Sequence, residues 1–269
     1  MRALELAIIG GTGVYDPGVL SDVRQVTVDT PYGTASALVG KRGDKEIAFM
    51  ARHGYRHTVP PHMINHRANI AALKMMGVKR VMATCAVGSM NTAMPPGSFV
   101  FMDQFIDFAK SEVRTFFDGG DRGVVHVDYT NPYCPEIRAA LVSNARRMGI
   151  IASDGGCYVC TDGPRFETPA EIRMFQMLGG DIVGMTGVPE VVLAREAGMC
   201  YASIAMVTNW AAGITGEPLG HSEVVEIMQA NGERLRELMM LTIDALPDER
   251  HCACGHNAPD MPWLGRVDV

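Results

Sequence analysis

Short apolar segments alternate with longer amphipathic segments along most of the chain. The short segments have the length and composition of buried strands, and we expect strands at Ala7–Gly10, Ile47–Met50, Arg80–Thr84, Phe99–Met102, Asp181–Gly184 and Cys200–Val207. Apolar positions three or four residues apart predict helices at Asn65–Met76, Cys134–Arg147, Pro169–Leu178, Pro189–Ala197 and Glu223–Leu246. This alternation predicts an α/β fold with a largely parallel or mixed central sheet flanked by helices.

The domain organisation follows from a single change in composition near the end of the chain. From Pro247 onward the sequence is rich in Cys, His, Pro and Gly, whereas no internal repeat or low-complexity linker precedes it. We therefore expect one catalytic domain over residues 1–246 and a C-terminal extension over residues 247–269.

Composition and charge narrow the class of protein. Of the 269 residues, 47% are hydrophobic and 20% are charged, which is ordinary for a globular protein. The formal net charge of −6 argues against a nucleic acid or an anionic membrane as the partner. No segment has the length of a membrane-spanning helix, and the first residues do not form a secretory signal. An odd number of cysteines, 7, predicts mostly reduced thiols, so we expect a cytoplasmic protein.

Glycine and polar clusters follow several of the expected strands directly. They are Gly10–Gly13, Ala51–Gly54, Thr84–Gly88, Gly184–Gly187 and Thr208–Asn209. In open α/β sheets the ends of the strands form the ligand crevice, so the five clusters predict one shared pocket.

Three of these clusters carry groups that bind anions. The loop at Thr12 offers backbone N–H groups and a hydroxyl, although a plain tight turn explains it equally well. Arg52 and His53 supply a cation and a second donor, unless they are a surface pair. Thr186 precedes a helix, where a hydroxyl and free N–H groups favour an anion, although simple helix capping is the alternative.

Glu167 and Asn209 form the second half of the expected pocket. A carboxylate accepts from a ring N–H, and a neutral amide donates to a ring carbonyl. A 6-oxopurine offers that pattern at N1–H and at O6 or N7, whereas adenine reverses it. The neighbouring aromatic side chains Phe166 and Trp210 suit a flat heterocycle. This pair therefore predicts both the binding and the selection of a 6-oxopurine.

Metal and redox chemistry are not expected in this pocket. His57, His62 and His66 have no Cys or carboxylate partner at ligand spacing, so we expect no metal there. Cys157–Cys160 lies in a strand-like segment and predicts buried structural thiols. The tail segment His251–His256 has two thiols and two imidazoles, which permit a soft metal, a disulfide or a reduced, disordered tail. None of these states is expected to be essential for catalysis.

Several of these motifs stand in an order that resembles the trimeric purine nucleoside phosphorylase and methylthioadenosine phosphorylase family. The resemblance runs from the Gly10 loop to about His221 and includes Ala51–Gly54, Gln104–Asp107, Gly163–Glu167, Met185–Glu190 and Val191–Gly198. It implies a single-domain nucleoside phosphorylase fold. It also implies cleavage of the N-glycosidic bond of a purine nucleoside by inorganic phosphate, a co-substrate, with no further cofactor.

The resemblance assigns roles to individual residues. Phosphate is expected to contact Thr12, Arg52, His53, the Cys85–Ala86 backbone and Thr186. The nucleoside is expected to contact Phe166, Glu167, Met185, Asn209, Ala211 and His221. His126 falls where the family inserts a residue into the ribose pocket of a neighbouring subunit, which implies a homotrimer, alone or paired into a hexamer. The chain departs from its relatives at Cys85, where they have Thr or Asn.

The expected chemistry places Asn209 and Glu167 in the catalytic role. Cleavage leaves an oxocarbenium-like ribose and pushes electrons onto the purine, whose developing charge Asn209 meets with a hydrogen bond while Glu167 holds N1–H. Members of the methylthioadenosine branch resemble Ala-Thr-Asp-x-Asp where this chain has Val207–Ala211, and they have a small hydroxyl residue in place of Glu167. The expected function is therefore phosphorolysis of inosine and guanosine.

The alternative is a methylthioinosine or methylthioadenosine phosphorylase, because the overall likeness to that branch is high. His221 favours a 5′-hydroxyl substrate. An NAD-dependent oxidoreductase is disfavoured, because the Gly10–Gly13 loop lacks the third glycine of the dinucleotide fingerprint. A non-catalytic, metal-responsive protein that uses Cys252 and Cys254 is the remaining alternative.

Overall fold

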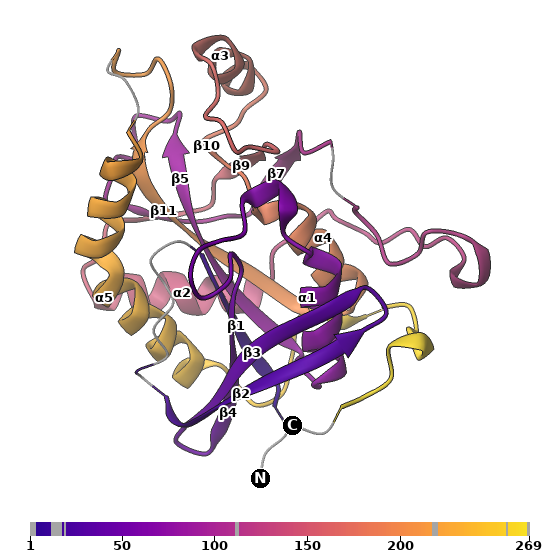
Figure 1. Cartoon of the computed structure of the whole chain (residues 1–269). Coiled ribbons are helices and arrows are strands. Elements are labelled where there is room, and N and C mark those ends of the chain that lie inside the picture. The colour runs from indigo at the N-terminus through magenta and orange to yellow at the C-terminus, as the bar shows by residue number, and fades with distance from the viewer. Residues whose placement is uncertain are drawn as a thin grey trace.

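The protein is built on one mixed sheet of 11 strands with helices packed on both faces (Figure 1). The computed structural model describes residues 4–11, 18, 20–110, 113–216, 220–256 and 258–267, and the first three residues of the last helix by backbone alone. The strands are β1 (Leu6–Gly10), β2 (Ser21–Thr30), β3 (Gly33–Arg42), β4 (Lys45–Ala51), β5 (Arg80–Ser89), β6 (Phe99–Phe101), β7 (Gln104–Asp107), β8 (Ala152–Asp154), β9 (Cys157–Cys160), β10 (Ile182–Gly184) and β11 (Cys200–Trp210). The helices are α1 (His66–Met75), α2 (Pro135–Arg147), α3 (Pro169–Met177), α4 (Gly187–Glu196) and α5 (His221–Ala245), with short 3-10 turns η1 (Pro61–Met63), η2 (Gly120–Arg122), η3 (Ala253–Gly255) and η4 (Pro262–Leu264).

The strand order is β2-β3-β4-β1-β5-β10-β9-β7, and β11, β6 and β8 branch from β5. Parallel ladders join β1 to β4 and β5, whereas β10 runs antiparallel to β5. The sequence-based prediction of an α/β fold with a mixed central sheet flanked by helices is therefore confirmed.

Alternate residues of the central strands point to opposite faces, and each face is covered by a different pair of helices. Ile9 and Val81 belong to the core beneath α1 and α4, whereas Ile8 and Met82 belong to the core beneath α2 and α5. This period of two explains why the central strands read as continuous apolar runs, because both faces are buried.

The helix starts are defined by local chemistry. The Asn65 side chain caps α1 by accepting from the Ala68 N–H. Thr168 and Glu171 form a reciprocal capping box at the start of α3, directly after Phe166 and Glu167. No helix among the described residues is long and apolar enough to cross a membrane.

Two groups of strands differ from the expectation. The hairpin β2–β3 and the short strands β7 and β8 were not anticipated, because most of their residues are exposed or half-buried. Strands β5 and β11 also continue past the expected ends, through Gly88 and Asn209. The clusters at Thr84–Gly88 and Thr208–Asn209 therefore lie within strands, not after them.

Candidate active site

The site lies where β5 changes its neighbour in the sheet. Strand β1 pairs with β5 only as far as Ala83, and β10 begins to pair with the same edge at Gly88. Between them, in the described part of the sheet, residues 84–87 pair with β11 alone. A change of neighbour of this kind opens a crevice at the strand ends, which is the usual ligand position in α/β sheets.

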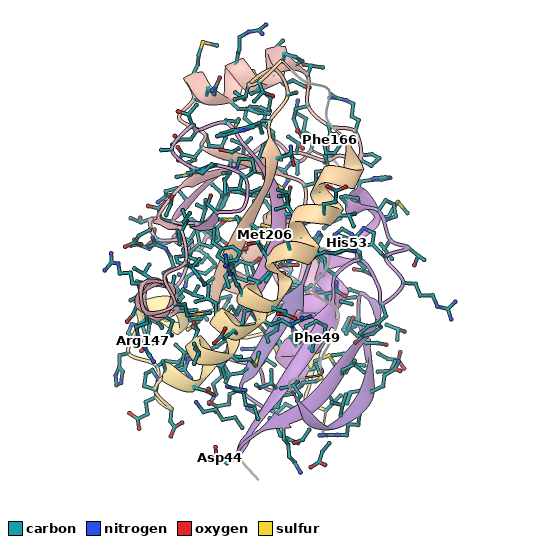
Figure 2. All side chains as sticks on the ribbon, turned by 90° about the vertical axis from the view of Figure 1, so that its left-hand side faces the viewer. Asp44, Phe49, His53, Arg147, Phe166 and Met206 are labelled. Carbon is teal, nitrogen blue, oxygen red and sulfur yellow. The ribbon has the colours of Figure 1, made fainter. Side chains whose placement is uncertain are left out.

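A cavity of about 390 Å³ occupies this crevice. It gathers most of the predicted site residues, namely Arg52, His53, Cys85, Ala86, Phe166, Glu167, Met185, Thr186, Asn209 and Ala211. Figure 2 shows Phe166 in the upper part of the molecule and His53 below it, both beside α5 and both well above Asp44. Segments far apart in the sequence thus meet in one pocket, as the clusters of polar residues predicted.

A larger cavity, of about 660 Å³, lies at the opposite ends of β1 and β5. Its wall carries both signs of charge, and Lys79 pairs there with Glu5. Glu46, in the same wall, is paired with Arg24. The smaller cavity is therefore the better candidate, because its polar groups converge on one enclosed space.

Arg52 is held by a buried carboxylate. Its Nε and Nη2 each donate to Glu190 at 2.7 Å, and both side chains are 1% exposed. Its Nη1 donates to the Thr84 carbonyl at 2.7 Å. Three of the five N–H groups of the guanidinium are thus engaged, which leaves one on Nη1 and one on Nη2 for a ligand. The role of Arg52 as a bidentate cation for an anion therefore stays a prediction, and it rests on these two N–H groups.

Arg52 and Glu190 each stabilise the ionised form of the other. Burial alone lowers the pKa of Arg52, but the adjacent Glu190 carboxylate outweighs it and raises that pKa. Burial raises the pKa of Glu190, but Arg52 reverses this and lowers it to about 2. Tyr201 also donates to Glu190 at 2.7 Å. Both groups are therefore charged at every physiological pH.

His53 presents a neutral imidazole to the cavity. Burial lowers the pKa of His53 to about 4, and the neighbouring Arg52 charge adds to this effect. Its Nδ1 lies 2.9 Å from the Val59 carbonyl, which can only accept, so Nδ1 carries the proton. The other nitrogen, Nε2, is then an acceptor. His53 therefore offers an acceptor to the cavity, not the second donor that the sequence predicted.

Thr186 lies at the start of α4 without capping it, since its side chain makes no cap hydrogen bond. The N–H groups of Thr186 and Gly187 donate to the Tyr158 hydroxyl at 3.1 and 3.2 Å. These two N–H groups are therefore already engaged, and Thr186 itself lines the cavity.

The Cys85–Ala86 segment contributes backbone to the same wall. The Thr84 carbonyl faces Arg52, and alternate residues of a strand direct their polar groups to the same side, so the Ala86 N–H faces the crevice. Burial raises the pKa of Cys85 to about 11, which keeps its thiol neutral. Gly11 closes this wall, because a Cβ there would lie 2.6 Å from the Thr84 oxygen.

Asn209 reaches the cavity because β11 is irregular. The register with β5 shifts between Val207 and Asn209. The Thr208 hydroxyl lies 2.9 Å from the Asn209 Oδ1, and the Asn209 Nδ2 donates to the Trp210 carbonyl at 2.8 Å. These contacts fix the orientation of the amide, and its second Nδ2 hydrogen remains for a ligand.

Glu167 lines the same cavity from the loop before α3. Its Oε1 accepts from the Thr161 hydroxyl at 2.7 Å. Burial raises the pKa of Glu167 above the ordinary range of a glutamate, despite this hydrogen bond. Phe166 lies beside it at the rim and is 40% exposed. Glu167 and Asn209, which the sequence predicted to bind the base, thus line the same cavity.

Three predicted site residues are not among those that line the cavity. Thr12 lies outside the described residues, and of His221 only the backbone, at the start of α5, is described. His126 is exposed on the segment between β7 and α2, which projects away from the sheet (Figure 1). It does not line the cavity of its own chain.

Several residues that hold the site together were not predicted from the sequence. Glu190 anchors Arg52, Thr161 holds Glu167, and Thr208 orients Asn209. Glu190 had a signal, because it is a carboxylate inside an otherwise apolar helical segment, Val188–Ala194. The Thr161 contact joins two segments across a loop, and no spacing in the sequence indicates it.

The chain belongs to the phosphorylase superfamily, whose family model matches residues 5–244. It is 59% identical to a probable 6-oxopurine nucleoside phosphorylase of Moorella thermoacetica, over 99% of this chain and 100% of the relative. It is 55% identical to the 6-oxopurine nucleoside phosphorylase of Pyrococcus furiosus, over 93% and 96% of the two chains. Methylthioadenosine phosphorylase from Schistosoma mansoni, solved in complex with adenine, matches with a TM-score of 0.84 at 33% identity, covering 92% of this chain and 93% of that chain. The predicted nucleoside phosphorylase fold is confirmed.

Proposed function

We propose that the protein is a purine nucleoside phosphorylase that cleaves 6-oxopurine nucleosides, inosine and guanosine, with inorganic phosphate. The main support for the proposal is that one cavity is lined both by residues that suit an anion and by residues that suit a purine base. Arg52 and Thr186 suit an anion at one end. Glu167 and Asn209 suit the edge of a 6-oxopurine at the other. The names of the relatives from Moorella thermoacetica and Pyrococcus furiosus support the same substrate class.

In this proposal phosphate occupies the end of the cavity formed by Arg52, His53, Ala86 and Thr186. The two remaining N–H groups of Arg52 and the Ala86 N–H donate to its oxygens, and the His53 Nε2 accepts from a P–OH. Phosphate below C1′ stabilises the oxocarbenium-like ribose and then forms the new C1′–O bond. The products are the free base and ribose 1-phosphate.

The base leaves as its glycosidic electrons move onto the purine ring. The Asn209 Nδ2 donates to the ring where this negative charge develops, and its orientation is fixed in advance by Thr208 and Trp210. Glu167, when ionised, accepts from N1–H. Phe166 covers one face of the base, and Met185 lies along the ribose.

Phosphate-dependent turnover of inosine, guanosine and adenosine tests this function. We expect inosine and guanosine to be cleaved far faster than adenosine, because adenine has a donor at position 6 and no hydrogen on N1. Adenosine turnover as fast as inosine turnover would refute the base selection. Turnover that does not require phosphate would refute phosphorolysis.

The second candidate is a 5′-methylthioinosine or 5′-methylthioadenosine phosphorylase. Val224, in the first turns of α5, lines the cavity and is 7% exposed, which gives this wall an apolar group that suits a methylthio substituent. Comparing inosine with 5′-methylthioinosine separates the two candidates. His221→Ala should slow only the 5′-hydroxyl substrate, if His221 binds that hydroxyl.

We further propose a cytoplasmic homotrimer in which His126 completes the ribose pocket of a neighbouring subunit. Val124, on the same projecting segment, is 72% exposed, and an exposed apolar side chain of this kind suits a subunit interface. Light scattering of the purified protein tests the trimer and distinguishes it from a hexamer. His126→Ala should raise the KM for the nucleoside and leave the fold intact.

A further inference from the structure

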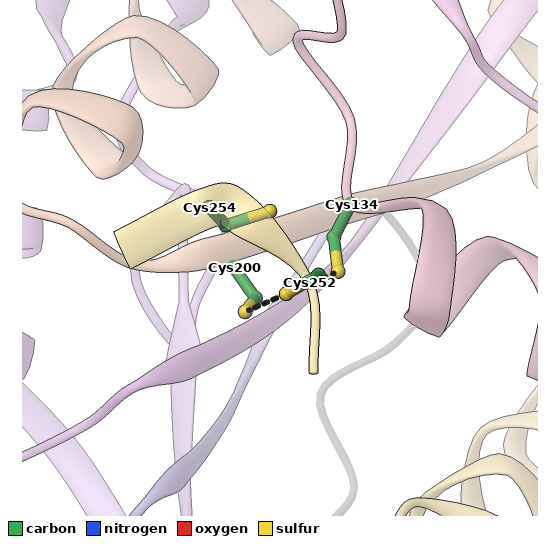
Figure 3. A group of neighbouring side chains, drawn as sticks. All are labelled: Cys134, Cys200, Cys252 and Cys254. Atoms are coloured by element: carbon green, nitrogen blue, oxygen red, sulfur yellow. Dashed lines mark hydrogen bonds between the residues drawn. The ribbon is translucent and has the colours of Figure 1, made fainter. Parts of the chain in front are cut away.

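Four cysteines from three distant parts of the chain converge at one point of the fold. Cys134 precedes α2, Cys200 begins β11, and Cys252 and Cys254 flank Ala253 in the C-terminal extension (Figure 3). Their four sulfur atoms all lie within 4.8 Å of one another. Cys134, Cys200 and Cys254 are buried, and Cys252 is half-buried.

The cluster is held in place by contacts that do not involve sulfur. The Cys134 N–H donates to the Tyr201 carbonyl at 2.7 Å, which ties the start of α2 to β11. Arg250 donates to the Gly198 carbonyl at 2.9 Å, and Arg80 donates to the Glu249 carbonyl at 2.9 Å. The extension is therefore positioned by the Arg250 side chain and by the Glu249 backbone carbonyl, and the four thiols are presented together as a preorganised set.

The separations of the sulfur atoms suit a tetrahedral metal ion. Cys134 Sγ lies 3.6 Å from Cys252 Sγ, and Cys200 Sγ lies 3.3 Å from Cys252 Sγ. Four thiolates around zinc, at Zn–S distances of about 2.3 Å, have sulfur–sulfur separations of about 3.8 Å. Small side-chain rotations would bring the four sulfurs to that geometry. The two imidazoles of the tail, His251 and His256, are exposed and do not join the cluster.

The surrounding charges suit an anionic metal centre. One zinc ion with four thiolates carries a net charge of −2, which burial makes costly without nearby cations. Arg250 Nη1 lies 3.9 Å from Cys200 Sγ. The Nε and Nη1 of Arg195 are buried and have no hydrogen-bond partner among the described residues, and the Arg195 charge acts on Cys254. These two guanidinium groups are placed to neutralise the centre.

We propose that Cys134, Cys200, Cys252 and Cys254 bind one zinc ion as a closed, structural tetrathiolate site. The site goes beyond the phosphorolysis reaction, and it selects the soft-metal state among the states that the sequence permits for Cys252 and Cys254. Two disulfides are the competing state. They would consume the same sulfurs but leave Arg195 and Arg250 without an anionic partner. Metal binding requires no oxidant, only the release of the thiol protons.

The site would fix the C-terminal extension to the body of the protein. Beyond the cysteines, the extension reaches α1 and the β2–β3 hairpin, where Trp263 Nε1 donates to the Tyr32 hydroxyl at 3.0 Å. Leu264 is buried in the same core as α1. A metal at the start of the extension would restrain the segment that makes these contacts.

Metal content of the full-length protein tests the proposal directly. The protein is purified under reducing conditions without chelator, and zinc is measured by mass spectrometry. We expect about one zinc per chain, and tetrahedral thiolate charge-transfer bands after exchange with Co²⁺. The double variant Cys252→Ser/Cys254→Ser should lose the metal. The matched control, Cys157→Ser, changes a half-buried cysteine outside the cluster and should retain it.

Three outcomes would overturn the proposal. They are a metal-free protein with all thiols reactive, a mass that shows two disulfides under the same conditions, and zinc retained by the double variant. If the double variant does not fold, Co²⁺ titration of the wild-type chain still decides the question. Removal of zinc by chelator should also lower the Tm, because the ion binds only the folded state. None of these readouts depends on nucleoside cleavage, so their failure would leave the proposed function intact.

Discussion

The two ends of the candidate active site are built in different ways. The phosphate end, consisting of Gly11, Arg52, His53, Ala86 and Thr186, is formed by buried strand ends and a buried ion pair. The base end, consisting of Phe166, Glu167, Asn209 and Ala211, combines one strand with a partly exposed loop. The first end is rigid and charged, whereas the second is adjustable and mostly neutral.

This difference separates the part of the site that every substrate needs from the part that selects among them. Phosphate is common to all phosphorolysis, and its end of the cavity is fixed by the ladders of the sheet and by Glu190. In the proposed function, the base is recognised by Glu167 on a loop and by Asn209 at an irregularity of β11. Substitutions at the phosphate end should therefore damage the fold as well as the reaction, and those at the base end the reaction alone.

Glu190→Gln should have the largest effect. It leaves the buried Arg52 guanidinium without its charged partner, which typically costs about 3–5 kcal/mol of unfolding free energy. The freed guanidinium should also lose its orientation, so the KM for phosphate should rise strongly. Denaturant unfolding and a phosphate titration at saturating inosine measure the two effects.

The control for this variant is Glu171→Gln. Glu171 pairs with Arg165 at the same 2.7 Å, but the two side chains are 33% and 66% exposed. Solvent screens such a pair, and glutamine preserves the capping box of α3, so the loss of stability should be much smaller. Equal losses in the two variants would show that burial does not distinguish the two ion pairs.

Asn209→Ala should have the next largest effect and should leave the fold intact. It removes a preorganised donor from the leaving base, so kcat for inosine should fall on the order of a hundredfold. The KM for phosphate and the Tm should change little, because Asn209 lies at the base end. A parallel drop in Tm would contradict the separation of the two ends.

Asn209→Asp tests selectivity at the same position. The change replaces an amide donor with a carboxyl group, so the preference should move toward 6-aminopurine nucleosides. The ratio of kcat/KM for adenosine to that for inosine measures this shift. An unchanged ratio would show that Asn209 does not read position 6 of the base.

The sequence predicted most of the architecture and most of the phosphate end, for a physical reason. Strands buried on both faces, such as Ile47–Met50, have a continuous apolar pattern, and helices buried on one face have regular spacing. The polar hairpin β2–β3 has neither signal, since most of β2 is exposed. It was therefore missed.

The contacts that tune the site could not be predicted, because they join segments far apart in the sequence. The Arg52–Glu190 pair spans 138 positions, and no local pattern shows that it occupies two of the five Arg52 N–H groups. The neutral state of His53 likewise follows from burial and from the Val59 carbonyl. Most of the residues predicted from the sequence line the pocket, but the sequence did not show which of their donors are already engaged.

The pH dependence of kcat/KM tests the role of Glu167 at the base end. Burial raises the pKa of Glu167, and only its ionised form accepts from N1–H. The kcat/KM for inosine should therefore decrease, as the pH falls, through a pKa above the ordinary range of a glutamate. His53 does not account for this step, because its pKa is about 4.

The matched variant for this measurement is Glu167→Gln. Its activity should be lower, and the ratio of wild-type to variant kcat/KM should decrease toward acidic pH. Taking the ratio at each pH removes the titration of phosphate itself, which is common to both proteins. A ratio that is constant with pH would mean that the ionisation of Glu167 does not affect the binding of the base.

Phe166→Leu should have the smallest effect and tests how adjustable the base end is. Phe166 is 40% exposed at the rim, and leucine keeps an apolar contact while removing the ring that stacks on the base. Aromatic contacts contribute about 0.5–1.5 kcal/mol beyond their buried area, so the KM for inosine should rise about two- to tenfold. Phe175→Leu changes a buried ring of the core beneath α3 and should lower the Tm instead. If Phe166→Leu lowers the Tm as much as Phe175→Leu, the base end is part of the rigid fold and the contrast between the two ends does not hold.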